Sequence, residues 1–179
     1  AIERIALDAA GGTLVLMTGY ERMTILQEHL GPLLGERLIV QERESGGVTR
    51  AMKSFRDAHA RGLCPVWVAT GGAWTGLDLV DKDLAAQDDL LLTDLVMPAL
   101  PFGLNHTHTH TAKVARNFGA EVAHASRLFR QGIGRLVRRE GLVRRRLWIL
   151  DGRLVVRQRL TAGFAAVIRR YDRVMPFQF

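Results

Sequence analysis

Short apolar runs that alternate with longer amphipathic segments constrain the fold of this sequence more than any other feature. The short runs have the length and composition of buried strands. In the longer segments apolar residues recur every three or four positions, which is the period of a helix packed on one side. This alternation is typical of a parallel sheet covered by helices on both faces. We therefore expect an α/β fold of three layers with a mainly parallel sheet in the middle.

The pattern also predicts where the elements begin and end. Strands are predicted over residues 13–17, 37–41, 65–70, 90–96 and 147–150, and helices over residues 1–10, 20–34, 47–62, 120–140 and 162–171. The expected apolar side of the second helix is Met23, Leu26, Leu30 and Leu33. That of the helix over 120–140 is Val122, Ala125, Phe129 and Leu136.

Length and composition favour a single globular domain. The chain has 179 residues, 47% hydrophobic and 24% charged, with Cys64 as its one cysteine. One thiol can form neither an intrachain disulfide nor a cysteine-held iron–sulfur cluster. No apolar run approaches the ~20 residues that span a bilayer, and no signal peptide is evident, so we expect a cytoplasmic protein without membrane contact. Ala1 in place of an initiator Met, and an opening helix, suggest a piece of a longer protein.

The charge is distributed unevenly. Residues 120–179 carry 14 basic residues, all Arg, against 4 acidic ones, whereas residues 1–119 carry 11 against 14. Arg binds phosphate as a planar donor with several N–H groups. The last third of the chain is thus expected to face an anionic partner, although a solvated basic face is the alternative.

A glycine-rich loop follows the third predicted strand. This glycine loop, Thr70–Asp78, reads Thr-Gly-Gly-Ala-Trp-Thr-Gly-Leu-Asp. Loops after the carboxyl ends of parallel strands line the ligand crevice, and glycines there let backbone N–H groups approach phosphate. The loop is a candidate nucleotide or phosphodiester site, and a purely structural turn is the other interpretation.

A second segment combines glycines with arginines. This arginine segment, Gln131–Arg138, reads Gln-Gly-Ile-Gly-Arg-Leu-Val-Arg, and its spacing would place Gln131, Arg135 and Arg138 on one helix face. Gly132 and Gly134 each cost a helix about 1 kcal/mol relative to Ala, which suggests a close approach by another backbone or by a ligand. Such a face suits the charge that develops on a transferring γ-phosphoryl group. A solvated Arg-rich surface is the alternative.

Histidine and tryptophan residues are further candidates for binding sites. His106, His108 and His110 alternate with Thr and could bind a metal along a strand. No carboxylate or Cys ligand is near, so we expect a polar surface segment and no metal site. Trp67 and Trp148 lie in apolar strands and are expected in the core. Trp74, within the glycine loop, is a candidate platform for a stacked base.

Together the two segments resemble the DinG/XPD group of superfamily 2 helicases. The resemblance rests on Gln-x-x-Gly-Arg-x-x-Arg paired with an upstream Trp-x-Gly-x-Asp, and it extends over nearly the whole chain. The glycine loop looks like helicase motif V, the arginine segment like motif VI, and Leu14–Tyr20 like the motif IV strand. Leu100-Pro-Phe102 and Leu150-Asp-Gly-Arg153 resemble the elements that follow in DinG proteins.

The resemblance implies the second RecA-like domain of an ATP-driven motor that moves 5′ to 3′ on single-stranded DNA. It implies that Arg135 and Arg138 are arginine fingers and that Gln131 contacts the γ-phosphate or the attacking water. The residues implied to couple nucleotide to domain closure are Gly76 and Asp78. The residues implied to contact DNA are Thr18, Gly19, Tyr20, Thr70, Gly71, Gly72 and Trp74.

Two departures from the family pattern suggest a divergent branch. Thr75 stands where the family has an acidic residue, and the basic stretch Glu140–Arg146 replaces an Asp-rich turn. The DinG proteins of type IV CRISPR systems are one candidate branch, which would make a CRISPR ribonucleoprotein complex a partner.

The sequence holds no Gly-x-x-x-x-Gly-Lys-[Ser/Thr] loop and no strand that ends in Asp-Glu after one. These elements grip the phosphates and Mg²⁺ of ATP. We therefore expect ATP and Mg²⁺ to be shared with an N-terminal RecA-like domain, without which the chain would be inactive. The alternatives are a non-catalytic RecA-like adaptor that binds nucleic acid and a phosphate-binding enzyme of another α/β family.

Overall fold

The computed structural model describes residues 1–83, 85, 89–103, 108, 109, 112, 118–136 and 143–169. Its centre is a five-stranded sheet with the order β2-β3-β1-β4-β5, in which all neighbouring strands are parallel. The strands are β1 (Thr13–Leu16), β2 (Leu38–Val40), β3 (Val66–Ala69), β4 (Asp94–Met97) and β5 (Arg146–Ile149). The expected α/β fold with a parallel sheet is confirmed.

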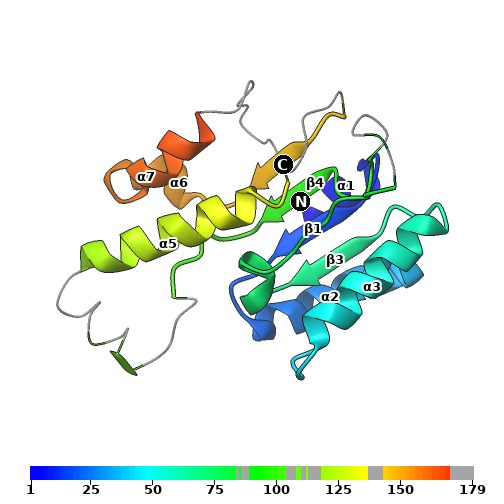
Figure 1. The fold of residues 1–179 in the computed structure, drawn as a ribbon. Coiled ribbons are helices and arrows are strands. Elements are labelled where there is room, and N and C mark those ends of the chain that lie inside the picture. The colour runs from blue at the N-terminus through cyan, green and yellow to red at the C-terminus, as the bar shows by residue number, and fades with distance from the viewer. Residues whose placement is uncertain are drawn as a thin grey trace.

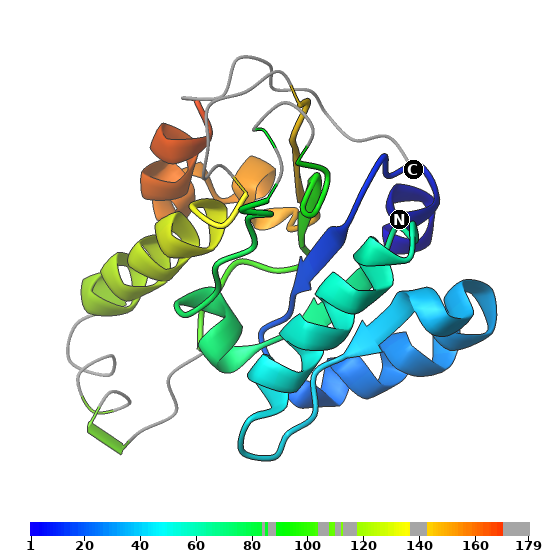
Figure 2. The same ribbon diagram turned by 45° about the vertical axis from the view of Figure 1, so that its right-hand side comes forward.

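Helices cover both faces of the sheet (Figures 1 and 2). One face carries α1 (Ile2–Leu7) and α2 (Tyr20–Leu34), while the other carries α3 (Gly47–Ala60), α5 (Phe118–Ile133) and α7 (Gln158–Ile168). The short helices are η1 (Gly35–Arg37), η2 (Gly71–Trp74) and α6 (Arg153–Val156). Within the described residues, no helix combines the length and the apolar character needed to span a membrane.

Alternating side chains of the central strand divide the core into two clusters. Leu14 and Leu16 point to the cluster that contains Phe55 and Phe129. Val15, between them, points to the opposite cluster under α1 and α2. Because β1, β3 and β4 are buried along their whole length, their sequences are mostly apolar rather than alternating between apolar and polar residues.

Several predicted elements differ from the structure. The helices predicted over 1–10, 120–140 and 162–171 correspond to α1, α5 and α7, which have other bounds. The strand predicted over 90–96 begins only at Asp94, because Leu90 and Thr93 exchange backbone hydrogen bonds with Gly12 where the chain enters the sheet. In α2 the buried residues are Met23, Leu30 and Leu34. Leu33, which was expected on the apolar side, is 51% exposed.

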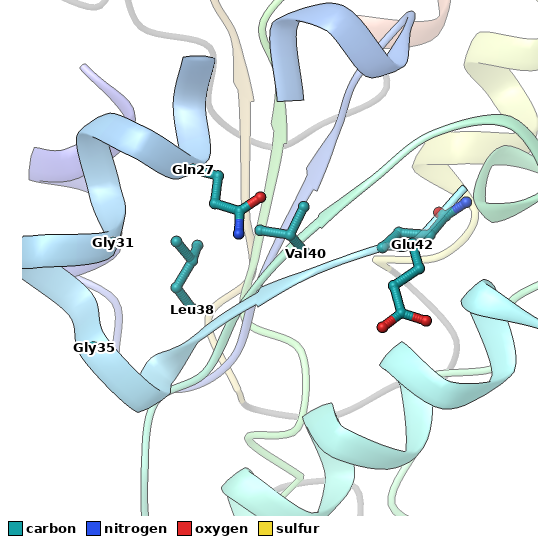
Figure 3. Close-up of a pocket in the computed structure, with 7 residues that line it drawn as sticks. Gln27, Gly31, Gly35, Leu38, Val40 and Glu42 are labelled. Carbon is teal, nitrogen blue, oxygen red and sulfur yellow. The ribbon is translucent and has the colours of Figure 1, made fainter. Parts of the chain in front are cut away.

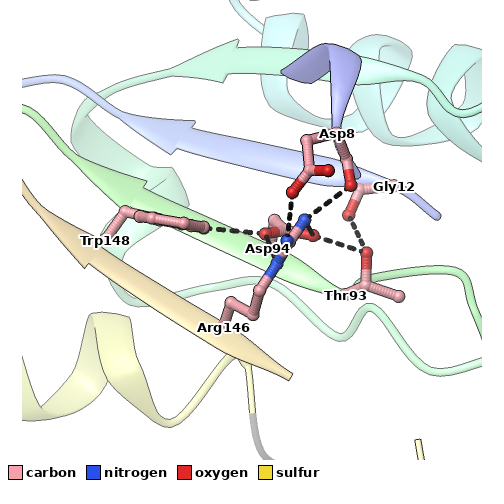
Figure 4. A network of polar contacts seen from close by, with 6 residues as sticks. All are labelled: Asp8, Gly12, Thr93, Asp94, Arg146 and Trp148. Carbon is pink, nitrogen blue, oxygen red and sulfur yellow. Dashed lines mark hydrogen bonds and ion pairs between the residues drawn. The ribbon is translucent and has the colours of Figure 1, made fainter. Parts of the chain in front are cut away.

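A polar network around the buried Asp94 joins three elements at the amino end of the sheet (Figure 4). Asp94 is fully buried, and its carboxylate accepts hydrogen bonds from Arg146 Nε and Trp148 Nε1, both at 2.7 Å. Arg146 also donates to Asp8 Oδ2 at 2.5 Å. Burial alone would lower the pKa of Arg146, but its bonds to Asp94 and Asp8 outweigh burial and raise it. The network therefore ties β5 to β4 and to the end of α1, at the edge opposite the predicted site.

Candidate functional site

The two segments singled out in the sequence meet at the carboxyl edge of the sheet. The chain leaves β1 through Met17–Gly19 and β3 through the glycine loop, and parallel strands place both exits at the same edge. Figures 1 and 2 show η2 between α3 and α5. The end of α5 contributes Gln131 at this edge, beside η2. The sheet thus brings three predicted site segments together.

The glycine loop turns sharply directly after β3. Thr70 is extended, and Gly71 then adopts a φ of 58°, a left-handed conformation that L side chains rarely take. The turn is closed by the N–H of Gly76, which donates to Gly72 O at 2.9 Å. Gly71, Gly72 and Gly76 are all exposed. Their backbone is therefore accessible to a ligand.

Two loop residues expected to contact DNA instead bond to the protein interior. Trp74 is fully buried, and its indole N–H donates to Met17 O at 2.9 Å. Thr70 is 2% exposed, and its hydroxyl donates to the same carbonyl at 2.9 Å. The expectation that Trp74 stacks a base is wrong, because both faces of its ring are packed in the core. The expectation that the Thr70 side chain contacts DNA is also wrong, because this side chain is buried and its hydroxyl is bonded to Met17 O.

Gln41, which the sequence pattern did not indicate as a site residue, joins the loops after β1, β2 and β3. Gln41 directly follows β2 and is 5% exposed. Its Oε1 accepts the N–H of Thr70 at 3.1 Å, and its Nε2 donates to the Tyr20 hydroxyl at 2.9 Å. The only sign of this role in the sequence is one amide side chain at the end of an apolar strand. Many strands end in a polar residue, so this sign does not distinguish Gln41 from them.

The arginine segment begins on α5 but leaves the helix before its first Arg. The helix ends at Ile133, and the N–H groups of Arg135 and Leu136 donate to carbonyls three residues back, as in a tight turn. The prediction that Gln131 and Arg135 share a helix face is therefore wrong. Arg138 lies outside the described residues.

Gly132 explains how closely α5 approaches the glycine loop. A Cβ atom on Gly132 would lie 2.9 Å from Met97 Cε and 3.0 Å from Trp74 Cε3. The approach to this glycine is close, but the approaching groups are two core side chains and not the backbone or ligand that the sequence predicted. No such close approach is found at Gly134, because a Cβ atom there would meet only the carbonyls of Arg130 and Gln131 at 3.4 Å.

Arg135 links the arginine segment to the glycine loop. Its guanidinium donates through Nη1 to Leu77 O and through Nη2 to Thr75 O. Arg56 of α3 donates to the next exposed carbonyl, Asp78 O, at 2.8 Å. Arg135, in the turn after α5, and Arg56, on α3, therefore both bind carbonyls in the second half of the glycine loop.

Gln131, Gly76 and Asp78 remain exposed around this contact. Gln131 is on the last turn of α5, and Gly76 and Asp78 flank the carbonyl of Leu77 that Arg135 binds. The structure therefore gathers an amide, a guanidinium, a backbone turn and a carboxylate at one surface. Such a set can bind phosphate oxygens, but it contains no nucleophile of its own.

The two family-like elements beyond the motifs also meet. Asp151 accepts the N–H of Leu100 at 2.7 Å and pairs with Arg153, whose Nη2 lies 2.5 Å from Asp151 Oδ2. Arg153 in turn covers the ring of Phe102 at 5.0 Å. Burial would raise the pKa of the Asp151 carboxyl, but these hydrogen bonds outweigh it and hold the pKa below its ordinary value. This pair joins the loops after β4 and β5.

A pocket of about 360 Å³ opens between α2 and the edge strand β2 (Figure 3). Its one carboxylate, Glu42, already accepts bonds from Arg50 at 2.6 and 3.0 Å. The lining residues are Gln27, Gly31, Gly35, Leu38, Val40, Gln41 and Glu42. With one paired acid and no base, the pocket offers no acid–base chemistry.

Within the described residues, no group of three His, Cys, Asp or Glu side chains could hold a metal ion. His106 and His110 lie outside the described residues. The interpretation of the His-Thr stretch as a surface segment stays a prediction.

Comparison with known proteins identifies the family. The sequence matches the model of the helicase C-terminal domain over residues 2–170, so the chain belongs to the helicase C-terminal domain family. Two solved structures, described as XPD apo and XPD helicase, are similar at 17% and 18% sequence identity, with TM-scores of 0.60 and 0.58. They cover 90% and 92% of this chain, and they show that its fold is that of the RecA-like helicase domain of XPD.

The chain spans 32% and 29% of the length of those two XPD structures. No curated protein sequence matches it.

Proposed function

We propose that this helicase domain is the second RecA-like half of a DinG-type, ATP-dependent DNA helicase that moves 5′ to 3′. The observation that carries the proposal is the contact of Arg135 with the carbonyls of Thr75 and Leu77. It joins the segment proposed to meet ATP to the loop proposed to meet DNA. A motor needs such a link, because nucleotide state must change the grip on the strand.

On the nucleotide side, the exposed groups fit one wall of a phosphate site. Gln131 and Arg138 would contact the γ-phosphate, with Arg135 exchanging its carbonyl contacts for phosphate when the domains close. Arginines aimed at that group stabilise the charge that develops during transfer. Gly76 and Asp78 would sense the change through the loop that Arg135 releases.

The other wall of the nucleotide site must come from a partner domain. The chain has no Walker loop and no adjacent acid pair, so the Lys and the Mg²⁺-holding acids would belong to the N-terminal RecA-like domain of the same protein. Bound ATP would supply the phosphoryl group and Mg²⁺ the charge neutralisation. The residues described above would orient the phosphate and exclude water.

On the DNA side, the accessible groups lie after β1 and in the glycine loop. Thr18, Gly19 and Tyr20 are half-buried, while Gly71 and Gly72 are exposed. We propose that they contact the phosphodiester backbone of single-stranded DNA through hydroxyl and N–H groups. A cytoplasmic CRISPR ribonucleoprotein complex is the proposed assembly, on the strength of the DinG-like sequence alone.

The experiment is ATP turnover by the intact protein with and without single-stranded DNA. We expect Arg138→Ala and Arg135→Ala to lower DNA-stimulated turnover at least about 100-fold, as arginine fingers do in related transfers, while DNA affinity stays within about threefold. Arg127→Ala is the matched control, because Arg127 lies exposed on α5 and, among the described residues, bonds only to His124.

Turnover that is unchanged in both Arg variants would contradict the catalytic assignment. DNA binding without any ATP turnover in the intact protein would instead favour the adaptor function.

A further inference from the structure

The donor and acceptor of each hydrogen bond that Gln41 makes can be assigned from the atoms that it faces. A backbone N–H can only donate, so the Gln41 atom facing Thr70 N at 3.1 Å must be the amide oxygen. The amide NH₂ then faces Tyr20 and donates to its hydroxyl oxygen at 2.9 Å. The N–H of Thr70 thus fixes the orientation of the Gln41 amide, and this orientation makes the Tyr20 hydroxyl oxygen a hydrogen-bond acceptor from Gln41.

A tyrosine hydroxyl that accepts one hydrogen bond still has its own proton to donate. Among the described residues, no acceptor takes the proton of Tyr20. Tyr20 is half-buried, at the start of α2 and next to Thr18 and Gly19. Its O–H is therefore a donor presented at the same edge as the glycine loop.

A positive charge accompanies this donor. The guanidinium carbon of Arg43 lies 5.4 Å from the centre of the Tyr20 ring, and Arg43 is exposed. The acidic neighbours on either side, Glu42 and Glu44, pair with Arg50 at 2.6 and 3.9 Å. Arg43 itself has no ion-pair partner among the described residues, so its charge is available to a ligand.

We propose that Gln41 is a positioning residue that turns the Tyr20 hydroxyl into a donor for a phosphodiester oxygen, with Arg43 supplying the adjacent charge. A proton donor beside a guanidinium matches the oxygens of a phosphodiester, which only accept. This inference rests on the proposed function, since it assigns the nucleic-acid strand as the ligand. It adds Gln41 and Arg43 to the site and gives Tyr20 a defined chemical role.

The test measures binding of a fluorescein-labelled oligothymidylate to the intact protein by fluorescence anisotropy at several salt concentrations. Tyr20→Phe removes the donor, and we expect affinity to fall roughly tenfold, the loss typical of one bond to a charged acceptor. Arg43→Ala should weaken binding and reduce the slope of log affinity against log salt by about one phosphate contact.

Gln41→Glu is the decisive variant. A carboxylate would accept from both Thr70 N–H and the Tyr20 hydroxyl, so the proton of Tyr20 would turn inward and be lost to DNA. Gln27→Glu is the matched control, because Gln27 is an exposed residue of the same pocket and introduces the same charge. We expect Gln41→Glu to weaken binding roughly tenfold and Gln27→Glu less than about twofold.

A double-mutant cycle separates positioning from a general effect on the fold. If Gln41 acts through Tyr20, then Gln41→Glu weakens binding much less in the Tyr20→Phe background than in the unmodified protein. Equal effects in both backgrounds, or equal effects of Gln41→Glu and Gln27→Glu, would overturn the proposal. If Gln41→Glu proves too unstable to fold, unchanged affinity in both Tyr20→Phe and Arg43→Ala overturns it instead.

Two further results distinguish the possible sources of failure. We expect these variants to bind a fluorescent ATP analogue with unchanged affinity. If they instead lose affinity for the ATP analogue and bind DNA normally, the phosphate that contacts Tyr20 and Arg43 belongs to the nucleotide, and the proposal is overturned. An unmodified protein that binds no DNA would remove the proposed function as well. If the unmodified protein unwinds DNA and the Tyr20, Gln41 and Arg43 variants bind DNA with the same affinity as it does, only this inference is overturned and the proposed function stands.

Discussion

At the scale of single residues, burial determines which side chains near the carboxyl edge can reach a ligand. Trp74 and Tyr20 are both aromatic residues with one polar atom, and the resemblance to helicases implies DNA contact for both. Trp74 is fully buried, whereas Tyr20 is half-buried. The indole N–H of Trp74 is used on Met17 O, while the Tyr20 hydroxyl keeps its proton. Of these two side chains, only Tyr20 therefore has a group to offer.

Trp74→Phe tests this distinction. Removing the indole N–H and part of a buried ring should lower the free energy of unfolding by roughly 1–3 kcal/mol, measured by urea denaturation. Affinity for single-stranded DNA should stay within about twofold, since a buried ring stacks no base. A tenfold loss of affinity in a variant that remains folded would return Trp74 to the DNA site.

At the scale of elements, α5 reaches the glycine loop only because Gly132 has no side chain. The helix packs through the buried side chains of Phe129 and Ile133. On the same helix, Gly132 lies against Trp74 and Met97. A glycine within a helix is weakly unfavourable. Here it permits the contact that lets Arg135 reach the loop carbonyls.

Gly132→Ala is expected to destabilise the protein by about 1–3 kcal/mol, because its Cβ would overlap a rigid ring and a methionine methyl group. Gly134→Ala is the matched control, since its Cβ would meet only carbonyls at 3.4 Å and its φ is not positive. Thermal or urea unfolding of both variants measures the difference. A Gly132→Ala protein as stable as Gly134→Ala would show that α5 does not pack as described.

The Asp151–Arg153 pair gives the loops after β4 and β5 a dependence on pH. The pKa of Asp151 is below its ordinary value of 3.8 in the folded protein. Its stabilising contribution is therefore complete above the unfolded pKa and is lost as pH falls through the lower, folded value. We expect Asp151→Asn to lower the free energy of unfolding by about 1–2 kcal/mol at neutral pH.

That difference between Asp151→Asn and the unmodified protein should shrink as pH falls below about 4, where the native carboxyl also becomes neutral. Urea unfolding at a series of pH values measures it. A difference that stays constant down to the lowest pH at which both proteins fold would show that the charge of Asp151 is not what holds the two loops.

At the scale of the whole molecule, the apolar pattern was enough to predict the order of strands and helices. Short continuous runs such as Pro65–Thr70 have the length of strands that are buried on both faces, and the alternation with helices indicated a parallel sheet. The edge at which the glycine loop and the start of α2 meet followed from that topology. These features depend on local pattern and on the rule that parallel strands end together.

Features that depend on packing between distant segments could not be predicted. The end of α5 at Ile133 accompanies the contact of Arg135 with Thr75, a residue 60 positions away in the sequence. The role of Gln41 depends on Thr70, which is 29 positions away. Neither separation leaves a periodic signal in the sequence. The resemblance to helicases placed the motifs but did not indicate which of their side chains face inward.

Strand displacement by the intact protein on duplexes that carry a single-stranded tail tests the proposed helicase function most directly. We expect ATP-dependent displacement from a 5′-tailed duplex, little from a 3′-tailed one, and none by the Arg138→Ala variant. Displacement by Arg138→Ala at the rate of the unmodified protein, or no displacement of the 5′-tailed duplex by a protein that hydrolyses ATP, would contradict that function.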